Sequence, residues 1–250
     1  MALLPNRVRP FFLGTPPEGD LAWWSGRGDD LDNTMTRTIE VPAVAPILTM
    51  LANYDIEQDW DYAYVSVSTD GGTTWVNLAG NVTTNDDPNG QNEGNGITGT
   101  SADWVPATFD LSAYAGQTVL LRLRYWTDGF VFQDGFVADA ITLGAFFDGA
   151  EDGANGWDLD GFRETDGNET DTSFHAYIAE YRQYLKYDRS LETGPYNFGF
   201  LPTRPNYVEH FPYQDGLLIS YWDAYRRREG ERCRRLAEWP ELRFVDGLTA

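Results

Sequence analysis

The amino-acid sequence predicts an all-β protein made of two jelly-roll or β-sandwich-type units. Three observations lead to this fold class: residues alternate between apolar and polar with period two, turn clusters rich in Gly, Asp and Asn separate these runs, and no long helical periodicity interrupts the first half. With 42% hydrophobic and 15% aromatic residues, a chain of 250 residues can fill two such cores.

The strands of the first unit are predicted by their alternation and by β-branched and aromatic residues. The clearest runs are residues 36–41, 61–68, 119–126 and 135–143. Turn residues follow at 70–72 and 86–90, and a polar loop at 91–101. The stretch from Ser68 to Trp75 also matches a hairpin that recurs in sialidase propellers. A propeller needs several copies, so the single copy predicts one hairpin turn.

The second unit is predicted after an acidic, glycine-rich segment near residues 146–156. We expect an N-terminal segment over 1–18, a sandwich over 19–145, a smaller β unit over 146–223 and an atypical tail over 224–250. Within the second unit, residues 175–184 are expected to form a strand and residues 216–222 a buried strand, with a proline-rich stretch at 194–212 between them.

The tail differs in composition from the rest of the chain. Residues 224–250 carry seven arginines and five acids, and they include Cys233, which is the single cysteine. Two interpretations stay open: a terminal helix with a solvated basic face, or a shifted reading frame or truncation scar. One thiol allows no intrachain disulfide.

The charge balance excludes some partners. The chain has 39 Asp and Glu residues against 18 Lys and Arg residues, a net charge of −21, which repels phosphate backbones and makes nucleic acid an unsuitable partner. No apolar run reaches the length of a membrane span. The N-terminus lacks the pattern of a signal peptide, so an exported parent protein would carry its signal outside this chain.

Catalytic motifs are sparse. A zinc protease of the H-E-x-x-H type needs two histidines on one helical turn with a glutamate as base. Here His175 and His210 lie far apart in the sequence and outside that motif, and no G-x-S-x-G elbow occurs. We therefore expect no catalytic residues in this chain. A glycosidase with paired carboxylates is the alternative enzyme class, although so many acids make such a pair uninformative.

Calcium is the cofactor that the acidic loops favour, because Ca²⁺ takes six to eight oxygen ligands from carboxylates and carbonyls. The candidates fall in four clusters along the chain, and none forms a complete EF-hand loop. Solvated acidic loops without metal are the alternative. The predicted ligands are Asp29, Asp32, Glu57, Asp59, Asp61, Asp134, Asp139, Asp148, Glu151, Asp158 and Asp160.

Several long segments carry a resemblance to a known family. WWSGRGDDLDNTMTRTIEVP, YDIEQDWDYAYVSVSTDGGTTW, NEGNGITG and DLSAYAGQTVLLRLRYWTDG resemble the MAM-like sandwich of immune inhibitor A-type metallopeptidases, peptidase family M6. GWDLDGFRETDG, AYIAEYRQYLKYD, GPYNFG and VEHFPYQDGLLISYWD resemble the VEG domain that follows it. The resemblance covers residues 19–223; after Asp223 the family's Asn-rich loop and His-Pro-Gly are replaced, which favours the frameshift interpretation.

The resemblance implies a fragment of a secreted bacterial zinc protease. The chain would be its non-catalytic C-terminal accessory region, partnered by a catalytic domain that holds the zinc elsewhere. The family's calcium binding fits the acidic loops, although its ligands cannot be transferred position by position. A protein or glycan substrate could contact this region. The alternative function is a stand-alone carbohydrate-binding sandwich, in which tryptophans such as Trp23, Trp24, Trp60 and Trp126 are exposed and stack on sugars. Packing of these tryptophans in the sandwich core is the other interpretation.

Overall fold

A computed structural model describes residues 2–186, 189, 192 and 215–223. The chain divides into two compact units, which we describe separately. One unit consists of Pro10–Asp171, and the other combines Met1–Arg9 with Thr172–Ala250. The histidine at position 210, Cys233, the proline-rich stretch and the tail from residue 224 lie outside the described residues.

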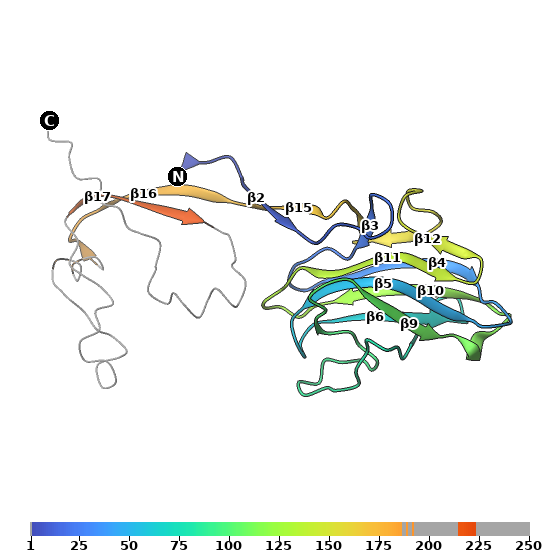
Figure 1. The fold of residues 1–250 in the computed structure, drawn as a ribbon. Coiled ribbons are helices and arrows are strands. Elements are labelled where there is room, and N and C mark those ends of the chain that lie inside the picture. Colours follow the sequence, from blue (N-terminus) through green and yellow to red (C-terminus); the bar gives the residue numbers. More distant parts are fainter. Residues whose placement is uncertain (1, 187–188, 190–191, 193–214, 224–250) are drawn as a thin grey trace. The chain divides into compact units, whose positions relative to one another are not determined.

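The unit from Pro10 to Asp171 is an antiparallel β-sandwich (Figure 1). Its first sheet has five strands in the order β13 (Asp158–Asp160), β4 (Asp32–Glu40), β10 (Thr118–Trp126), β6 (Tyr62–Ser68) and β7 (Val76–Asn77). Its second sheet follows the path β14 (Arg163–Thr165), β3 (Ala22–Trp24), β11 (Gly135–Leu143), β5 (Ile47–Ile56) and β8 (Gly99–Thr100). Two further strands join this sheet: β12 (Phe146–Asp148) pairs with β11, and β9 (Val105–Asp110) pairs with β5.

The core lies between the two sheets, because alternate residues of each strand point inward. On β10 the residues Val119, Leu121, Leu123 and Tyr125 are at most 2% exposed, while the residues between them are half-buried. The opposite sheet contributes residues such as Leu48, Met50, Ala52, Phe136 and Ala138. A 3₁₀ turn, η1 (Ser112–Tyr114), connects β9 to β10. Among the described residues, no helix is long and apolar enough to cross a membrane.

Strand β6 is buried on both faces. Its valines, Val65 and Val67, join the core, whereas Tyr62 and Tyr64 point to the outer face, where the loop between β7 and β8 covers them. The Tyr64 hydroxyl accepts a hydrogen bond from the Glu93 N–H at 3.0 Å. The alternation of this segment therefore predicts its strand but not the loop that shields its tyrosines.

The boundary between units differs from the one expected near residue 146. Strand β12 pairs with β11, β13 pairs with β4, and β14 pairs with β3, so the acidic segment after Phe146 turns inside the sandwich. The first compact unit consequently continues to Asp171. A glycine-rich acidic segment serves equally well as a hairpin turn and as a linker, and only strand pairing separates the two.

The other unit contains a three-stranded sheet in the order β1 (Ala2–Leu3), β16 (His175–Arg182) and β17 (Gly216–Asp223). Strands β2 (Arg7–Phe12) and β15 (Asn168–Ser173) form a separate two-stranded ladder, and the boundary between the units falls within both. The expected strands near residues 175–184 and 216–222 are present. The second was expected to be buried, but Leu217 is 66% and Ile219 45% exposed.

Candidate metal centre

A cluster of carboxylates lies at one edge of the sandwich, where β5 ends, β6 begins and β10 ends. Glu57 follows β5, Asp61 precedes β6, and Asp128 follows β10. Antiparallel pairing places Trp126, near the end of β10, opposite Tyr62, at the start of β6, which brings Asp128 close to Asp61. One carboxylate oxygen from each of these three acids lies within 4.8 Å of the other two.

Backbone hydrogen bonds hold the three acidic loops together. The Asp128 N–H donates to Oδ1 of Asp61 at 2.9 Å, and the Asp61 N–H donates to the Glu57 carbonyl at 3.1 Å. The loop before β4 joins them, because the Asp30 N–H donates to the Asp128 carbonyl at 2.7 Å. These contacts fix the carboxylates to rigid strand ends rather than to long, independent loops.

Asp61 is the most unusual acid of the cluster. Its side chain is 0% exposed, and Oδ2 has no hydrogen-bond partner. Burial raises the pKa of Asp61 to about 8; the N–H of Asp128 lowers it, and the negative charges of Asp128, Glu57 and Asp29 raise it further. A buried carboxylate surrounded by other carboxylates is costly without a compensating positive charge.

Tyr125 belongs to the same environment. It is 0% exposed and its hydroxyl has no hydrogen-bond partner. Burial raises the pKa of this hydroxyl well above its usual value, and the charges of Asp61, Asp55 and Glu57 add to the shift. Two buried oxygens at this cluster, Oδ2 of Asp61 and the Tyr125 hydroxyl, therefore have no hydrogen-bond partner. Such atoms are exceptions, because buried polar groups in proteins are normally hydrogen-bonded.

The donor set and spacing suit a calcium ion. Ca²⁺ binds oxygen at about 2.3–2.6 Å, so two oxygens on one ion are at most about 5 Å apart, and the three acids meet this limit. Zinc, in contrast, favours imidazole and thiolate ligands. Among the described residues, this group of Glu57, Asp61 and Asp128 is the one cluster in which three such ligands converge, and it contains no histidine.

The structure brings only part of the predicted ligand set together. Glu57 and Asp61 are in the cluster, and Asp29 is close enough to raise the pKa of Asp61. Asp128 was not among the predicted ligands. Asp128 lies just after β10, and β10 pairs with β6, the strand that begins after Asp61. The sequence alone does not give this pairing, so Asp128 could be recognised as a ligand only with the strand register known.

Other predicted ligands bind protein groups. Asp134 pairs with Arg27, and Asp32 pairs with Arg124. Glu151 accepts hydrogen bonds from two backbone N–H groups, of Asp20 and Leu21.

Two more predicted ligands sit in the sandwich core. Asp139 is 0% exposed and accepts hydrogen bonds from the N–H groups of Glu18 and Ala140. Asp148 accepts hydrogen bonds from Trp23 Nε1, Ala150 N, Asn155 Nδ2 and Trp157 Nε1.

The remaining predicted ligands lie nearer the surface. The Asp59 N–H donates to Thr98 Oγ1, next to the carboxylate cluster. Asp158 and Asp160 are exposed on the short strand β13. No second group of converging ligands is formed by these acids in the described part of the chain.

A polar groove of about 670 Å³ lies beside the second sheet. It is lined mainly by hydroxyl, amide and carboxylate side chains and contains no lysine or arginine; its lining includes Tyr54, Gln58, Asp59, Asn81, Thr84 and Asp86. Such a lining can donate and accept hydrogen bonds with hydroxyl groups, and it lacks the positive charge that an anion would need.

The fold and the cluster define the class of protein as an acidic antiparallel β-sandwich module with a carboxylate site at one edge. A family profile described as "Immune inhibitor A-like, MAM domain" matches residues 11–167. The chain belongs to this family. The matched range ends close to Asp171, where the sandwich unit also ends.

Similarity to curated proteins extends beyond the sandwich. The chain is 35% identical over 214 residues to the pre-pro-metalloprotease PrtV of Vibrio cholerae serotype O1, which covers 83% of this chain and 21% of that protein. It is 29% identical over 205 residues to immune inhibitor A of Bacillus thuringiensis subsp. alesti, which covers 78% of this chain and 27% of that protein. The chain thus spans about a fifth to a quarter of the length of these relatives.

Proposed function

We propose that this chain is a non-catalytic accessory region of a secreted zinc metalloprotease and that calcium bound at Glu57, Asp61 and Asp128 stabilises it. Its family and the name of PrtV support the association with a protease. The sequence supports the accessory role, because it has two histidines and no H-E-x-x-H motif. The catalytic zinc would then be held by another part of the parent protein, and the VEG-type segment would continue the accessory region.

The observation that carries the calcium site is Oδ2 of Asp61. This atom is buried without a hydrogen bond, in a side chain that is 0% exposed, and the carboxylates around it repel its charge. A divalent cation between Glu57, Asp61 and Asp128 would supply the missing partner and neutralise the repulsion. It would also join the ends of three strands and so rigidify this edge of the sandwich.

Thermal unfolding of the chain in EGTA and in 1 mM Ca²⁺ tests the site. A dissociation constant of about 10 μM gives about 2.7 kcal/mol of stabilisation, and the melting temperature should rise by about 5–10 °C. Asp61→Asn should abolish the rise, whereas Asp158→Asn, which changes an exposed acid, should retain it. An equal response to 1 mM Mg²⁺, or no response to Ca²⁺, would contradict the assignment.

The accessory role has its own test. The purified chain should not hydrolyse casein with or without added Zn²⁺, because two histidines outside a zinc motif cannot activate a metal-bound water. A parent protease lacking this region should lose stability or substrate turnover that the intact parent retains. Casein hydrolysis by the purified chain would overturn the proposal.

The polar groove favours a second candidate function, a carbohydrate-binding module. Its hydroxyl and amide lining and its volume of about 670 Å³ suit a neutral sugar. A glycan array probed with the chain tests this candidate, and Asp86→Ala should weaken any binding at the groove. Binding that survives this change, or an array without signal, would exclude the groove as the sugar site.

A further inference from the structure

The outer face of the five-stranded sheet carries two arginines on one strand, Arg122 and Arg124. Both lie on β10 and point away from the core, since Leu121 and Leu123 point into it. Strand pairing places Arg122 between Thr36 on β4 and Ser66 on β6. Directly paired residues share a face of the sheet, so Thr36 and Ser66 flank Arg122 on this face.

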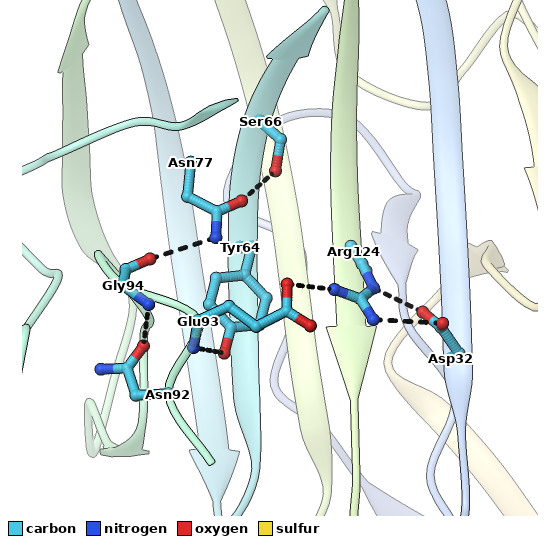
Figure 2. Close-up of polar contacts among 8 residues, drawn as sticks. All are labelled: Asp32, Tyr64, Ser66, Asn77, Asn92, Glu93, Gly94 and Arg124. Atoms are coloured by element: carbon cyan, nitrogen blue, oxygen red, sulfur yellow. Dashed lines mark hydrogen bonds and ion pairs between the residues drawn. The ribbon is translucent and has the colours of Figure 1, made fainter. Parts of the chain in front are cut away.

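Arg124 has carboxylate partners on both sides. Its guanidinium contacts Asp32 through Nε and Nη2 and Glu93 through Nη1, as Figure 2 shows. The Glu93 backbone in turn donates to the Tyr64 hydroxyl. All three guanidinium nitrogens of Arg124 therefore have carboxylate partners within the protein.

Arg122, two residues away on the same face, has no such partner. Within the described part of the chain it forms no ion pair or hydrogen bond, and its Nε is buried without an acceptor. Burial lowers the pKa of Arg122, and the positive charge of Arg124 lowers it further, although Asp32 and Glu93 oppose the shift. In a chain with 39 acids and 18 basic residues, a half-buried arginine without a carboxylate partner is unexpected.

A tryptophan supports this guanidinium. The Arg122 Cζ lies 3.9 Å from the ring centroid of Trp75, a stacking distance. Trp75 is itself fixed by the hairpin between β6 and β7, because its Nε1 donates to the Gly72 carbonyl at 3.1 Å. Asp70 closes this turn by accepting hydrogen bonds from the Thr74 N–H and hydroxyl. The guanidinium is thus supported on one side by the indole, and within the described part of the chain its terminal nitrogens have no hydrogen-bond partner.

We propose that Arg122, stacked on Trp75, anchors a binding site for an acidic sugar, in which the guanidinium takes the sugar's carboxylate. A guanidinium fork matches a carboxylate in a bidentate arrangement. The hydroxyl of Thr36 and the carboxylate of Asp158, which pairs with Thr36 on the neighbouring strand, can bind the ring hydroxyls. Nothing in this site depends on the calcium cluster or on the polar groove.

The surrounding charge selects a sugar with one carboxylate over an acidic peptide. Asp32, Glu93 and Asp158 lie on or beside this face, and they repel a ligand that carries several negative charges. The same carboxylates accept hydrogen bonds from sugar hydroxyls. A single uronate residue in an otherwise neutral glycan satisfies both conditions.

Calorimetric or NMR titration of the whole chain with D-glucuronate and D-galacturonate tests the proposal, with D-glucose, acetate and a glutamate-rich peptide as comparison ligands. Saturable millimolar binding of a uronate is expected, together with binding at least tenfold weaker for glucose, acetate and the peptide. Affinity should fall as NaCl rises, because one charge pair forms. Absence of uronate binding, or equal binding of glucose, acetate or the peptide, would overturn the proposal.

Variants locate the site. Arg122→Gln should weaken uronate binding at least tenfold, and Arg122→Lys should also weaken it because the planar fork is lost. The matched control is Arg163→Gln: Arg163 also stacks on a tryptophan, 4.3 Å from the ring of Trp24, but it is paired with Glu169. This control should bind within twofold of the unmodified chain.

A fold check accompanies these measurements. If Arg122→Gln unfolds, as judged by its melting curve, Thr36→Val takes its place and should weaken binding at least threefold. Equal losses in Arg122→Gln and Arg163→Gln, or no loss in Thr36→Val and Arg122→Lys, would also overturn the assignment. EGTA should leave uronate binding unchanged, so failure of this site and failure of the calcium site can be distinguished.

Discussion

Asp61 and Asp148 are both buried acids in the same sandwich, yet their surroundings are opposite. Asp148 is 3% exposed and accepts four hydrogen bonds, two of them from the indoles of Trp23 and Trp157. Asp61 is 0% exposed and accepts one, from the Asp128 N–H, with other carboxylates around it. Burial of an acid therefore does not by itself indicate a metal ligand. The distinguishing feature is whether protein hydrogen-bond donors already satisfy the carboxylate oxygens.

Asp139 is intermediate between the two. It accepts two N–H groups, from Glu18 and Ala140, while the carboxylates of Glu18 and Glu151 lie nearby. Burial raises the pKa of Asp139 to about 6, the two N–H groups lower it, and the neighbouring acids raise it. The number of donors around each buried acid thus falls from Asp148 to Asp139 to Asp61. Four experiments break or sharpen this order.

The largest effect is expected for Asp148→Asn. The amide nitrogen would face N–H donors and leave at least one buried indole without an acceptor, so the free energy of unfolding should fall by about 3–5 kcal/mol. Urea unfolding measures it. The loss should be equal in EGTA and in Ca²⁺, because Asp148 takes no part in the cation site. A loss of unfolding free energy that depends on Ca²⁺ would place Asp148 in a metal site, and Asp148 and Asp61 would then no longer differ in role.

Asp61→Asn should have the opposite sign in EGTA. In EGTA the buried Asp61 carboxyl must either carry a negative charge among carboxylates or take up a proton, and both cost free energy. The neutral amide avoids this cost, keeps an oxygen for the Asp128 N–H, and offers an N–H to its acidic neighbours. We expect a gain of about 2 kcal/mol in the free energy of unfolding in EGTA. The same urea experiment measures the gain. A loss comparable to that of Asp148→Asn would show that Asp61 is a structural acid.

Asp139 should titrate near pH 6 in the folded chain. Because this pKa is raised above the usual value of 3.8, the contribution of Asp139 to stability is present below pH 3.8 and is lost as pH rises through 6. The loss should be about 1 kcal/mol or more. NMR titration of the carboxyl carbon measures the midpoint, and Glu151→Gln should lower it by removing a repelling charge. A titration midpoint near pH 4 would show that Asp139 is not intermediate between Asp148 and Asp61.

The smallest effect is expected for the double substitution Asp158→Asn and Asp160→Asn. Both acids are exposed on the edge strand β13, where surface substitutions change stability by about 0.5 kcal/mol or less. The calcium-dependent rise in melting temperature should remain intact. If the calcium-dependent rise disappears in this variant, the cation binds at β13, and the assignment of the site to the buried Asp61 is wrong.

The sequence was informative where structure is local. Alternation predicted the strands that became β4, β6, β10 and β11, because side chains on a strand point alternately to its two faces. The turn from Ser68 to Trp75 was also predicted, and it joins the paired strands β6 and β7. The resemblance of long segments to the immune inhibitor A family is confirmed by the family match over residues 11–167.

Partners distant in the chain could not be predicted in the same way. The acidic segment after Phe146 was interpreted as a linker, yet β12, β13 and β14 extend both sheets of the sandwich. The segment at 216–222 was expected to be buried from its apolar residues alone. In the structure Leu217 and Ile219 are exposed. The expectation was wrong because an apolar run in a sequence does not specify which other segment covers it.

Composition and periodicity by themselves determined an acidic all-β chain, its main strands and a supply of carboxylates far larger than any site needs. Only the tertiary structure decided which acids matter: antiparallel register joined Asp128 to Glu57 and Asp61, surrounded Asp148 with donors and left Arg122 on Trp75 without a partner. The physical reason is that a side chain's charge and hydrogen-bonding capacity are local properties, whereas the groups that satisfy them come from strands remote in sequence.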